Sequence, residues 1–400
     1  MFASLSSAEW NLKIPGPKGK EEIRRRLGHS YPDLEERARR AVYEFVERSF
    51  DSAQGALRHY YRADTRSYAE PDSGNFLMAG NYLAMYDRHG EPRMLARAAS
   101  CFRWAYRNCT ELHPMFTWQG GVRDQFRPHE LYVKYTSDAL RTALALEARA
   151  PDDEQLFAAR QFHGFVKQAR AAGFMAKFDT LTYRFSNTGF AWNTFGGPLL
   201  AYLQFYELTS EERYLAEARA WADHGLTLQA ENGAFYLIDN AFWNSDLVAP
   251  ELLGLTFLHE VTGRAAYLAA AIRYADWLLP RQRDDGAWPI GIDRDDEICA
   301  PNVGPGDMPH IALALVRLHR NTGDDRYLQA AIAAVRYGIR MQAVEDGKYP
   351  VHLDDPHVRW GFWSWDPAYD HSLSGDQSVH HVRGMLMVAD YIGSLADESA

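Results

Sequence analysis

The sequence has little cysteine and no long apolar run. It contains three cysteines, Cys101, Cys109 and Cys299, and no Cys-x-x-Cys pair. So few cysteines exclude a disulfide framework, and the lack of a Cys-x-x-Cys pair argues against a structural zinc site. No apolar run reaches the length of about 18 residues that a membrane-spanning helix requires. The first thirty residues also lack the apolar core of a secretory signal, so we expect a cytoplasmic protein.

An excess of positive charge is also missing. The 400 residues include 43 Lys+Arg and 53 Asp+Glu, which gives a net charge of -10. Proteins that bind nucleic acid normally carry a basic stripe, and the one basic run here, residues 24–26, is short. We therefore expect neither a nucleic-acid partner nor a membrane partner. The hydrophobic fraction of 46% is ample for a large core and excludes a disordered chain.

An internal repeat is the most informative feature that the sequence does contain. Three tyrosine–leucine pairs recur at spacings of 53 and 60 residues, and they are Tyr214-Leu215, Tyr267-Leu268 and Tyr327-Leu328. Fifteen residues after each tyrosine stands a glutamine that opens a turn with a glycine and an aromatic residue, and these glutamines are Gln229, Gln282 and Gln342. A constant internal offset in three copies indicates a repeated structural unit.

Each repeat unit reads as two helices. The first is apolar nearly all round, as in residues 250–258 and 311–318, and such a helix is buried. The second is amphipathic, as in residues 267–277. Counting the buried helices places their starts near residues 74, 137, 196, 247, 308 and 377, and a helix over 33–49 supplies the remaining outer partner.

Six helical hairpins in one chain predict an all-α, closed (α/α)6 toroid with an inner and an outer ring. An open solenoid would need polar capping repeats at both ends, and residues 379–392 do not read as a cap. No linker rich in Gly, Ser or Pro separates the units. We therefore expect one toroid domain over residues 33–400, preceded by an extension over residues 1–32.

The repeat, with its Tyr-Leu-x-x-Ala and Gln…Gly-x-aromatic elements, resembles the six-hairpin glycosidase superfamily over residues 33–395. This superfamily includes glycoside hydrolases, unsaturated-uronyl hydrolases, sugar 2-epimerases and toroidal polysaccharide lyases. The resemblance implies a carbohydrate-active enzyme with an oligosaccharide or polysaccharide substrate. It leaves the sugar, the linkage and the oligomeric state open, and we expect no cofactor.

Four aspartates fall at equivalent ends of four predicted inner helices, and they are Asp138, Asp246, Asp307 and Asp376. Aspartate is also a preferred N-cap, which is the simplest explanation for any one of them. The loops that enter the inner helices of a toroid gather over one mouth, however, so the four carboxylates should converge there. Asp246 and Asp307 are the predicted catalytic pair, because their placement looks like that of the general acid/base of unsaturated-uronyl hydrolases. One would be protonated and the other ionised.

Aromatic and polar side chains near the same mouth are predicted to bind the sugar. Aromatic planes stack on the apolar faces of sugar rings, and the sugar hydroxyls need amide, carboxylate or imidazole partners. Besides Asp138 and Asp376, the predicted substrate-binding residues are Trp118, Arg123, Trp192, Asn193, Trp243, Asn244, Trp363, Trp365, His371 and His380. An arginine such as Arg123 would bind a carboxylate of the substrate with two hydrogen bonds.

Three alternatives stay open. A polysaccharide lyase or uronate epimerase on the same toroid would use Tyr135 or His310 as the base, and a sugar 2-epimerase would pair His310 with His380 or His381. Residues 293–296 match the Asp-x-Asp-Asp acidic motif of class II terpene cyclases, although so short a motif often arises by chance. A non-catalytic sugar-binding toroid is the third. Asp376 and His380 have the i, i+4 spacing of metal ligands but no third ligand, so no metal site is predicted.

Overall fold

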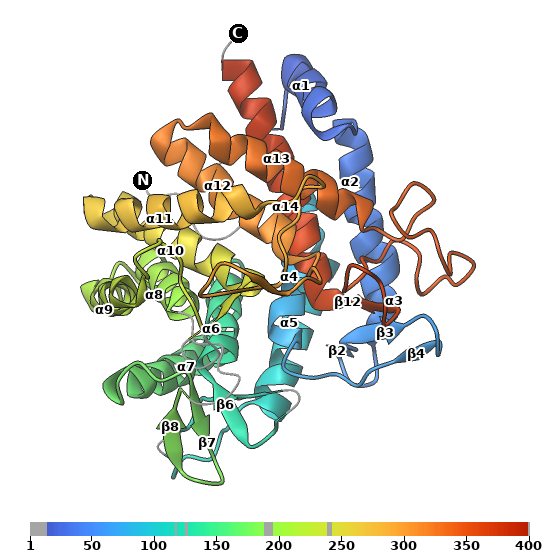
Figure 1. Cartoon of the computed structure of the whole chain (residues 1–400). Coiled ribbons are helices and arrows are strands. Elements are labelled where there is room, and N and C mark those ends of the chain that lie inside the picture. The colour runs from blue at the N-terminus through green and yellow to red at the C-terminus, as the bar shows by residue number, and fades with distance from the viewer. Residues whose placement is uncertain (1–13, 117, 125–126, 188–194, 238–241, 399–400) are drawn as a thin grey trace.

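A computed structural model describes residues 14–116, 118–124, 127–187, 195–237 and 242–398. Six helices form an inner ring, and they are α4 (Asn75–His89), α6 (Val133–Glu147), α8 (Gly196–Thr209), α10 (Ser245–Thr262), α12 (Asp307–Thr322) and α14 (Gly375–Glu398). Each packs against the next along the chain, and α14 returns to pack against α4, which closes the ring (Figure 1). The inner helices begin within four residues of the predicted starts.

An outer ring surrounds the inner one. Five of its members are α5 (Pro92–Cys109), α7 (Asp153–Ala171), α9 (Glu212–Leu228), α11 (Ala265–Leu278) and α13 (Asp325–Arg340). The sixth is α2 (Tyr31–Arg40), which continues through a π-helical segment, η2 (Ala41–Val46), into α3 (Glu47–Ser49) and packs on α14. The all-α toroid predicted from the repeat is therefore confirmed.

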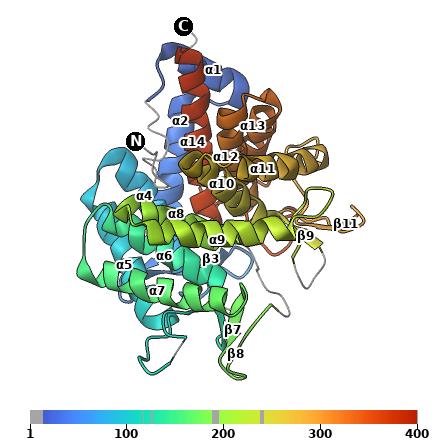
Figure 2. The same cartoon turned by 90° about the vertical axis from the view of Figure 1, so that its left-hand side faces the viewer.

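The two ends of the described chain meet. The N-terminal helix α1 (Pro17–Leu27) lies beside α14, as Figure 2 shows. The backbone N–H groups of Gly16 and Gly19 both donate to the carboxylate of Asp397, at 2.7 and 2.9 Å. The extension expected over residues 1–32 thus contributes α1 as a cover for the last helix of the ring.

Short antiparallel strands frame the loops that enter the inner helices. They form four small sheets: β1 (Phe50–Asp51) with β2 (Ala56–Leu57); β12 (Ser372–Ser374), β3 (Tyr60–Arg62) and β4 (Ser67–Tyr68); β5 (Val122–Arg123), β6 (Glu130–Tyr132), β7 (Lys177–Asp179) and β8 (Arg184–Ser186); and β11 (Ile298–Ala300), β10 (Gly291–Asp293) and β9 (Phe242–Asn244). β6, β9 and β12 run directly into α6, α10 and α14. These strands fix the backbone of the first turn of three inner helices, and the helical repeat did not predict them.

The repeated glutamine joins three of the outer helices, α9, α11 and α13, to the outer helix that follows in the ring. The amide of Gln229 donates to the carbonyl of Gly233 in its own turn and to that of Ala270 in α11, both at 2.9 Å. Gln282 makes the same pair of bonds, and its distant acceptor is Ala330 in α13. A partly buried amide held on two sides in this way fixes the spacing of neighbouring hairpins.

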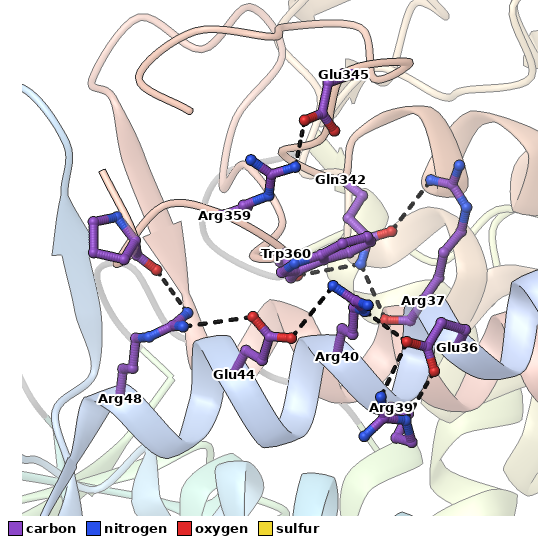
Figure 3. A network of polar contacts seen from close by, with 11 residues as sticks. Glu36, Arg37, Arg39, Arg40, Glu44, Arg48, Gln342, Glu345, Arg359 and Trp360 are labelled. Atoms are coloured by element: carbon purple, nitrogen blue, oxygen red, sulfur yellow. Dashed lines mark hydrogen bonds and ion pairs between the residues drawn. The ribbon is translucent and has the colours of Figure 1, made fainter. Parts of the chain in front are cut away.

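The third copy of this bond closes the outer ring. Gln342 follows α13 and donates to the carbonyl of Arg37 in α2 at 3.2 Å, so the last outer helix is joined to the first. The loop over residues 341–371 is held on the same helix, because the Arg40 guanidinium lies 4.7 Å from the centre of the Trp360 ring and Arg48 donates to the Pro356 carbonyl (Figure 3). This loop carries residues that line the mouth of the toroid.

None of the helices in the described part of the chain combines the length and the apolar character needed to cross a membrane.

The glycine of the repeated turn makes a testable contribution to stability. Gly286 has a φ of +96°, and a Cβ there would lie 2.2 Å from the Ala333 carbonyl oxygen in α13. Gly286→Ala should therefore lower the free energy of unfolding by about 3 kcal/mol, since it adds a collision to a backbone conformation that costs about 1–2 kcal/mol. Gly263→Ala is the matched control, because Gly263 has a φ of +69° with no atom within 4 Å. Urea unfolding should show about 1 kcal/mol for the control. Equal losses in the two variants would contradict the close approach.

Candidate active site

A cavity of about 720 Å³ opens where the inner helices begin. Its polar lining comes from the first turns of α6, α10, α12 and α14 and from the loops and strands in front of them. The lining includes His59, Tyr60, Arg62, Ser73, Asp124, Arg127, Lys134, Tyr135, Asp138, Asn244, Asp246, Asp307, Ser364, Trp365, Asp370, Ser372, Ser374, Asp376 and Gln377. The four aspartates predicted to converge do share this cavity.

Asp246 faces the cavity instead of capping its own helix. The N-cap of α10 is Asn244, whose side-chain oxygen accepts from the Asp246 N–H at 2.9 Å. The carboxylate of Asp246 is therefore released for another partner, and Lys134 of α6 places its Nζ 2.5 Å from Asp246 Oδ2. Burial would lower the pKa of Lys134, but the charges of Asp246, Tyr135 and Asp138 and the hydrogen bond to Asp246 together outweigh burial and raise it.

Asp307 is the buried member of the group, with 7% of its surface exposed. It is the first residue of α12, and its side chain accepts from the hydroxyl of Ser245. Burial and then the negative charge of Asp246 raise the pKa of Asp307 to about 8, against the weaker opposing effects of the Ser245 hydroxyl and Lys134. Both effects favour the protonated form of this carboxyl group.

Asp376 is paired with a histidine that sequence analysis missed. His59, just ahead of β3, lies between two carboxylates, with its Nδ1 2.6 Å from Asp72 and its Nε2 3.4 Å from Asp376. Burial disfavours the charged ring, but the two carboxylates outweigh burial and raise the pKa of His59 well above its usual value. Although burial opposes it, the imidazolium also holds the pKa of Asp376 below its usual range.

Asp138 lies one turn along α6 from Lys134 and completes the group. Its carboxylate is 3.8 Å from Arg141 on the same helix. Burial raises the pKa of Asp138, while the charges of Lys134 and Arg141 oppose that rise.

A narrower cavity of about 110 Å³ continues along the toroid axis below the carboxylates. Lys134, Asp138 and Asp246 line both cavities, so the two are continuous. His310 and His380 lie at this lower level, with stacked rings whose centres are 4.2 Å apart. Burial lowers the pKa of His380 to about 4 and that of His310 well below its usual value, so both rings are neutral.

Among the other predicted residues, Tyr135, Asn244 and Trp365 line the cavity. His381, the alternative to His380, stacks on Phe362 outside the axis with ring centres 4.0 Å apart. Only one of the two adjacent histidines therefore faces inward, as helix geometry requires. Trp192 and Asn193 lie outside the described residues.

Five predicted substrate-binding residues do not line either cavity. Trp243 and Trp363 are fully buried, and their indole N–H groups donate within the protein, to the Tyr274 hydroxyl and the Tyr349 carbonyl. Trp118 stacks on Phe178 with ring centres 4.6 Å apart. Arg123 pairs with Glu111 at 3.3 Å, and His371 contacts His352 at 3.2 Å. Each has a partner inside the protein, and a role of these five residues in substrate binding stays a prediction.

The residues that the sequence analysis missed are mainly basic. His59 and Lys134 line the cavity, but neither recurs in the repeat, whereas Arg127, the alternative to Arg123 for binding a carboxylate, lines the cavity as well. A signal for Lys134 was present, because its spacing of four residues from Asp138 places the two on one face of a helix.

A separate group, His129, Glu130 and Asp179, has ligand atoms within 4.8 Å of one another. Glu130 there is already paired with Lys177 at 2.7 Å.

The fold and the sequence of this chain are both similar to those of known proteins. Solved structures of sugar-converting enzymes share the closed double ring of helices, so the chain has the fold that the predicted resemblance implies. A D-mannose isomerase has a TM-score of 0.71 and 12% identity, over 94% of this chain and 99% of the isomerase. The unsaturated glucuronyl hydrolase of Bacillus sp. GL1 has a TM-score of 0.60 and 14% identity, over 87% of this chain and 96% of the hydrolase.

In sequence, the chain is similar to an unsaturated rhamnogalacturonyl hydrolase of Bacillus subtilis (strain 168). The two are 27% identical over 207 residues, which is 49% of this chain. The match spans about half of the hydrolase, 52% of its length. No family model matches the chain.

The His59 contact predicts a pH-dependent loss of stability. His59→Gln leaves Asp72 and Asp376 without their shared cation and should cost about 3 kcal/mol at pH 6. Because folding raises the pKa of His59, the stabilisation is complete below about pH 6.5 and is lost as the pH rises through the folded value. Urea unfolding between pH 6 and pH 10 should therefore show a shrinking difference from the parent protein. The exposed His89→Gln serves as control, and an equal, pH-independent cost for both variants would refute the pairing.

Proposed function

We propose that this protein is a glycoside hydrolase that acts on an oligosaccharide, with Asp307 as the general acid. One observation carries the assignment: the pKa of Asp307 rises to about 8, whereas cations hold Asp246 and Asp376 in ion pairs. A protonated carboxyl group beside an ionised one is what acid-assisted cleavage of a glycosidic bond requires.

The two carboxylates take different roles in this reaction. Asp307 donates its proton to the leaving oxygen as the bond from that oxygen to the sugar breaks. Asp246, in contact with Lys134, accepts a proton from the water that attacks the same carbon, or stabilises the positive charge that develops there. Trp365 and Tyr135 line the same cavity and provide aromatic surface for sugar rings.

The preferred substrate class is an oligosaccharide that ends in an unsaturated uronate. The sequence relative is a hydrolase of unsaturated rhamnogalacturonyl substrates, and a second hydrolase of this kind shares the fold. The cavity also has basic groups at its wall, Arg62 and Arg127, which suit an anionic sugar in a chain of negative net charge.

A sugar isomerase or epimerase is the second candidate, because the D-mannose isomerase shares the fold. The residues predicted for that chemistry, His310 and His380, both reach the toroid axis. Their rings stack directly on each other at 4.2 Å, however, which leaves no space for a sugar between them. This arrangement favours the carboxylates as the reacting groups.

Carboxylate substitutions test the proposed roles. Asp307→Asn and Asp246→Asn should each lower kcat by roughly 10²–10⁴-fold while the helical circular dichroism stays unchanged. Asp324→Asn is the matched control, because Asp324 caps α13 away from the cavity and asparagine caps equally well. Activity that survives both cavity substitutions would show that neither carboxylate is catalytic.

A panel of substrates separates the candidate reactions. Hydrolysis of an unsaturated uronate removes its conjugated double bond, so the ultraviolet absorbance should fall. A lyase acting on a uronate polymer would raise the absorbance, with sensitivity to Tyr135→Phe or His310→Ala and not to the aspartate changes. Epimerisation of a reducing sugar would change the optical rotation with no new reducing end. A rise in absorbance would indicate a lyase, a change in optical rotation alone would indicate an epimerase, and either result would contradict the hydrolase proposal.

The pH profile gives an independent check on Asp307. Because the acid must be protonated, kcat/KM should fall as the pH rises through about 8. Asp246→Asn removes the negative charge that helps to hold the proton, so the basic limb of its residual activity should move to lower pH. A profile that stays flat to pH 9.5 would contradict the assignment of Asp307 as the acid.

A further inference from the structure

Lys134 occupies an unusual place in the toroid. It lies on the face of α6 that looks onto the axis, together with Asp138 and Arg141, which follow at helical spacings of four and seven residues. Its partner Asp246 belongs to α10, and α6 and α10 are separated in the inner ring by α8. The contact of 2.5 Å between Lys134 Nζ and Asp246 Oδ2 therefore joins helices that are not neighbours in the ring.

We propose that Lys134 is a positioning residue that keeps Asp246 ionised, so that the single proton of the Asp246–Asp307 pair rests on Asp307. The inference rests on the proposed function for its catalytic meaning. It concerns the location of a proton, however, and that location can be measured without a substrate.

Two close carboxylates in one cavity repel each other when both are ionised, so such a pair retains one proton to a higher pH than either alone. Which member holds the proton depends on the partners of each. Asp246 has the ammonium of Lys134, which stabilises the ionised form, whereas Asp307 has the neutral hydroxyl of Ser245 and deeper burial. The negative charge that remains on Asp246 then favours the protonated form of Asp307.

The other charged groups at the cavity do not replace Lys134 in this role. The titratable groups that line the cavities around the pair include Tyr135, Asp138 and Arg141 from α6, His310 from α12, Asp376, His380 and Arg383 from α14, His59 ahead of β3, and Arg62, Asp124, Arg127 and Asp370 from the strands and loops of the mouth. His59 is held between Asp72 and Asp376, and Arg141 lies 3.8 Å from Asp138. Burial keeps the two histidines of the lower cavity neutral. Lys134 contacts Asp246 directly, at 2.5 Å.

Carbon-13 NMR of the full chain, labelled at the aspartate carboxyl carbons, measures which carboxyl group carries the proton. The signals of the pair are assigned by their loss in Asp246→Asn and Asp307→Asn. At pH 6.5 we expect the parent protein to show an ionised Asp246 and a protonated Asp307. In Lys134→Met the proton should be shared, so that both signals move toward intermediate shifts and the Asp307:Asp246 proton ratio falls by roughly tenfold or more.

Three further variants make the result decisive. Lys134→Arg keeps the cation and should restore the parent spectrum, and Lys134→Gln repeats the test if the methionine variant does not fold. Lys177→Met removes a lysine from its ion pair with Glu130, which is outside the cavity lining, and should leave both signals unchanged. An Asp246 signal that stays fully ionised in the folded Lys134→Met or Lys134→Gln protein would overturn the inference.

Once the substrate panel has identified a substrate, kinetic measurements test whether the location of this proton affects the reaction. Lys134→Met should lower kcat roughly 10-fold or more with a smaller change in KM and should move the basic limb of the pH profile, while Lys134→Arg should recover most of the activity. If no glycoside is cleaved but the NMR pattern holds, the proposed function fails and the inference on the proton stands. If glycosides are cleaved and Lys134 variants leave the spectrum unchanged, the inference alone fails.

Discussion

The ring closes where α14 packs on α4 and where the last repeated glutamine joins α13 to α2, and the active site depends on that closure. Gln229 and Gln282 join successive outer helices, and Gln342 joins the last outer helix to the first through the Arg37 carbonyl. A ring brings the starts of all inner helices to one mouth, whereas an open solenoid would spread them along a surface. Four aspartates from helices far apart in the sequence therefore share one cavity.

Convergence also creates an electrostatic problem, since four carboxylates in one cavity repel one another. Each carboxylate has a different partner that reduces this repulsion. The partners are Lys134 for Asp246, His59 for Asp376, Arg141 for Asp138 and the Ser245 hydroxyl for Asp307. The carboxyl group that has no cation in contact is also the most buried. The carboxylates differ in their partners, and this difference, more than the number of acidic groups, determines which carboxyl group acts as the acid and which as the base.

The sequence was sufficient to predict the toroid and the carboxylates because both follow the repeat. An aspartate at the start of an inner helix must reach the mouth if the ring closes. Lys134 and His59 were missed because neither recurs, and His59 comes from a loop whose course the repeat does not set. Trp243 and Trp363 were assigned to the cavity because loop residues near the mouth were assumed to face it. Their indole groups instead donate to the Tyr274 hydroxyl of α11 and to the Tyr349 carbonyl in the loop over residues 341–371, contacts that no one-dimensional pattern specifies.

The N-cap interpretation of the aspartates fails for the predicted catalytic pair, and its failure has a physical consequence. Asn244 caps α10, and Gly306 occupies the N-cap position of α12, so Asp246 and Asp307 are both free of that task. Asp307 still lies in the first turn of α12, where the helix dipole favours a negative charge by about 1 kcal/mol at most in exposed settings, less than one pKa unit. The pKa of Asp307 nevertheless rises from 3.8 to about 8. Burial and the charge that Lys134 stabilises on Asp246 therefore outweigh the dipole, and a helix terminus that would ordinarily stabilise a carboxylate holds a protonated acid.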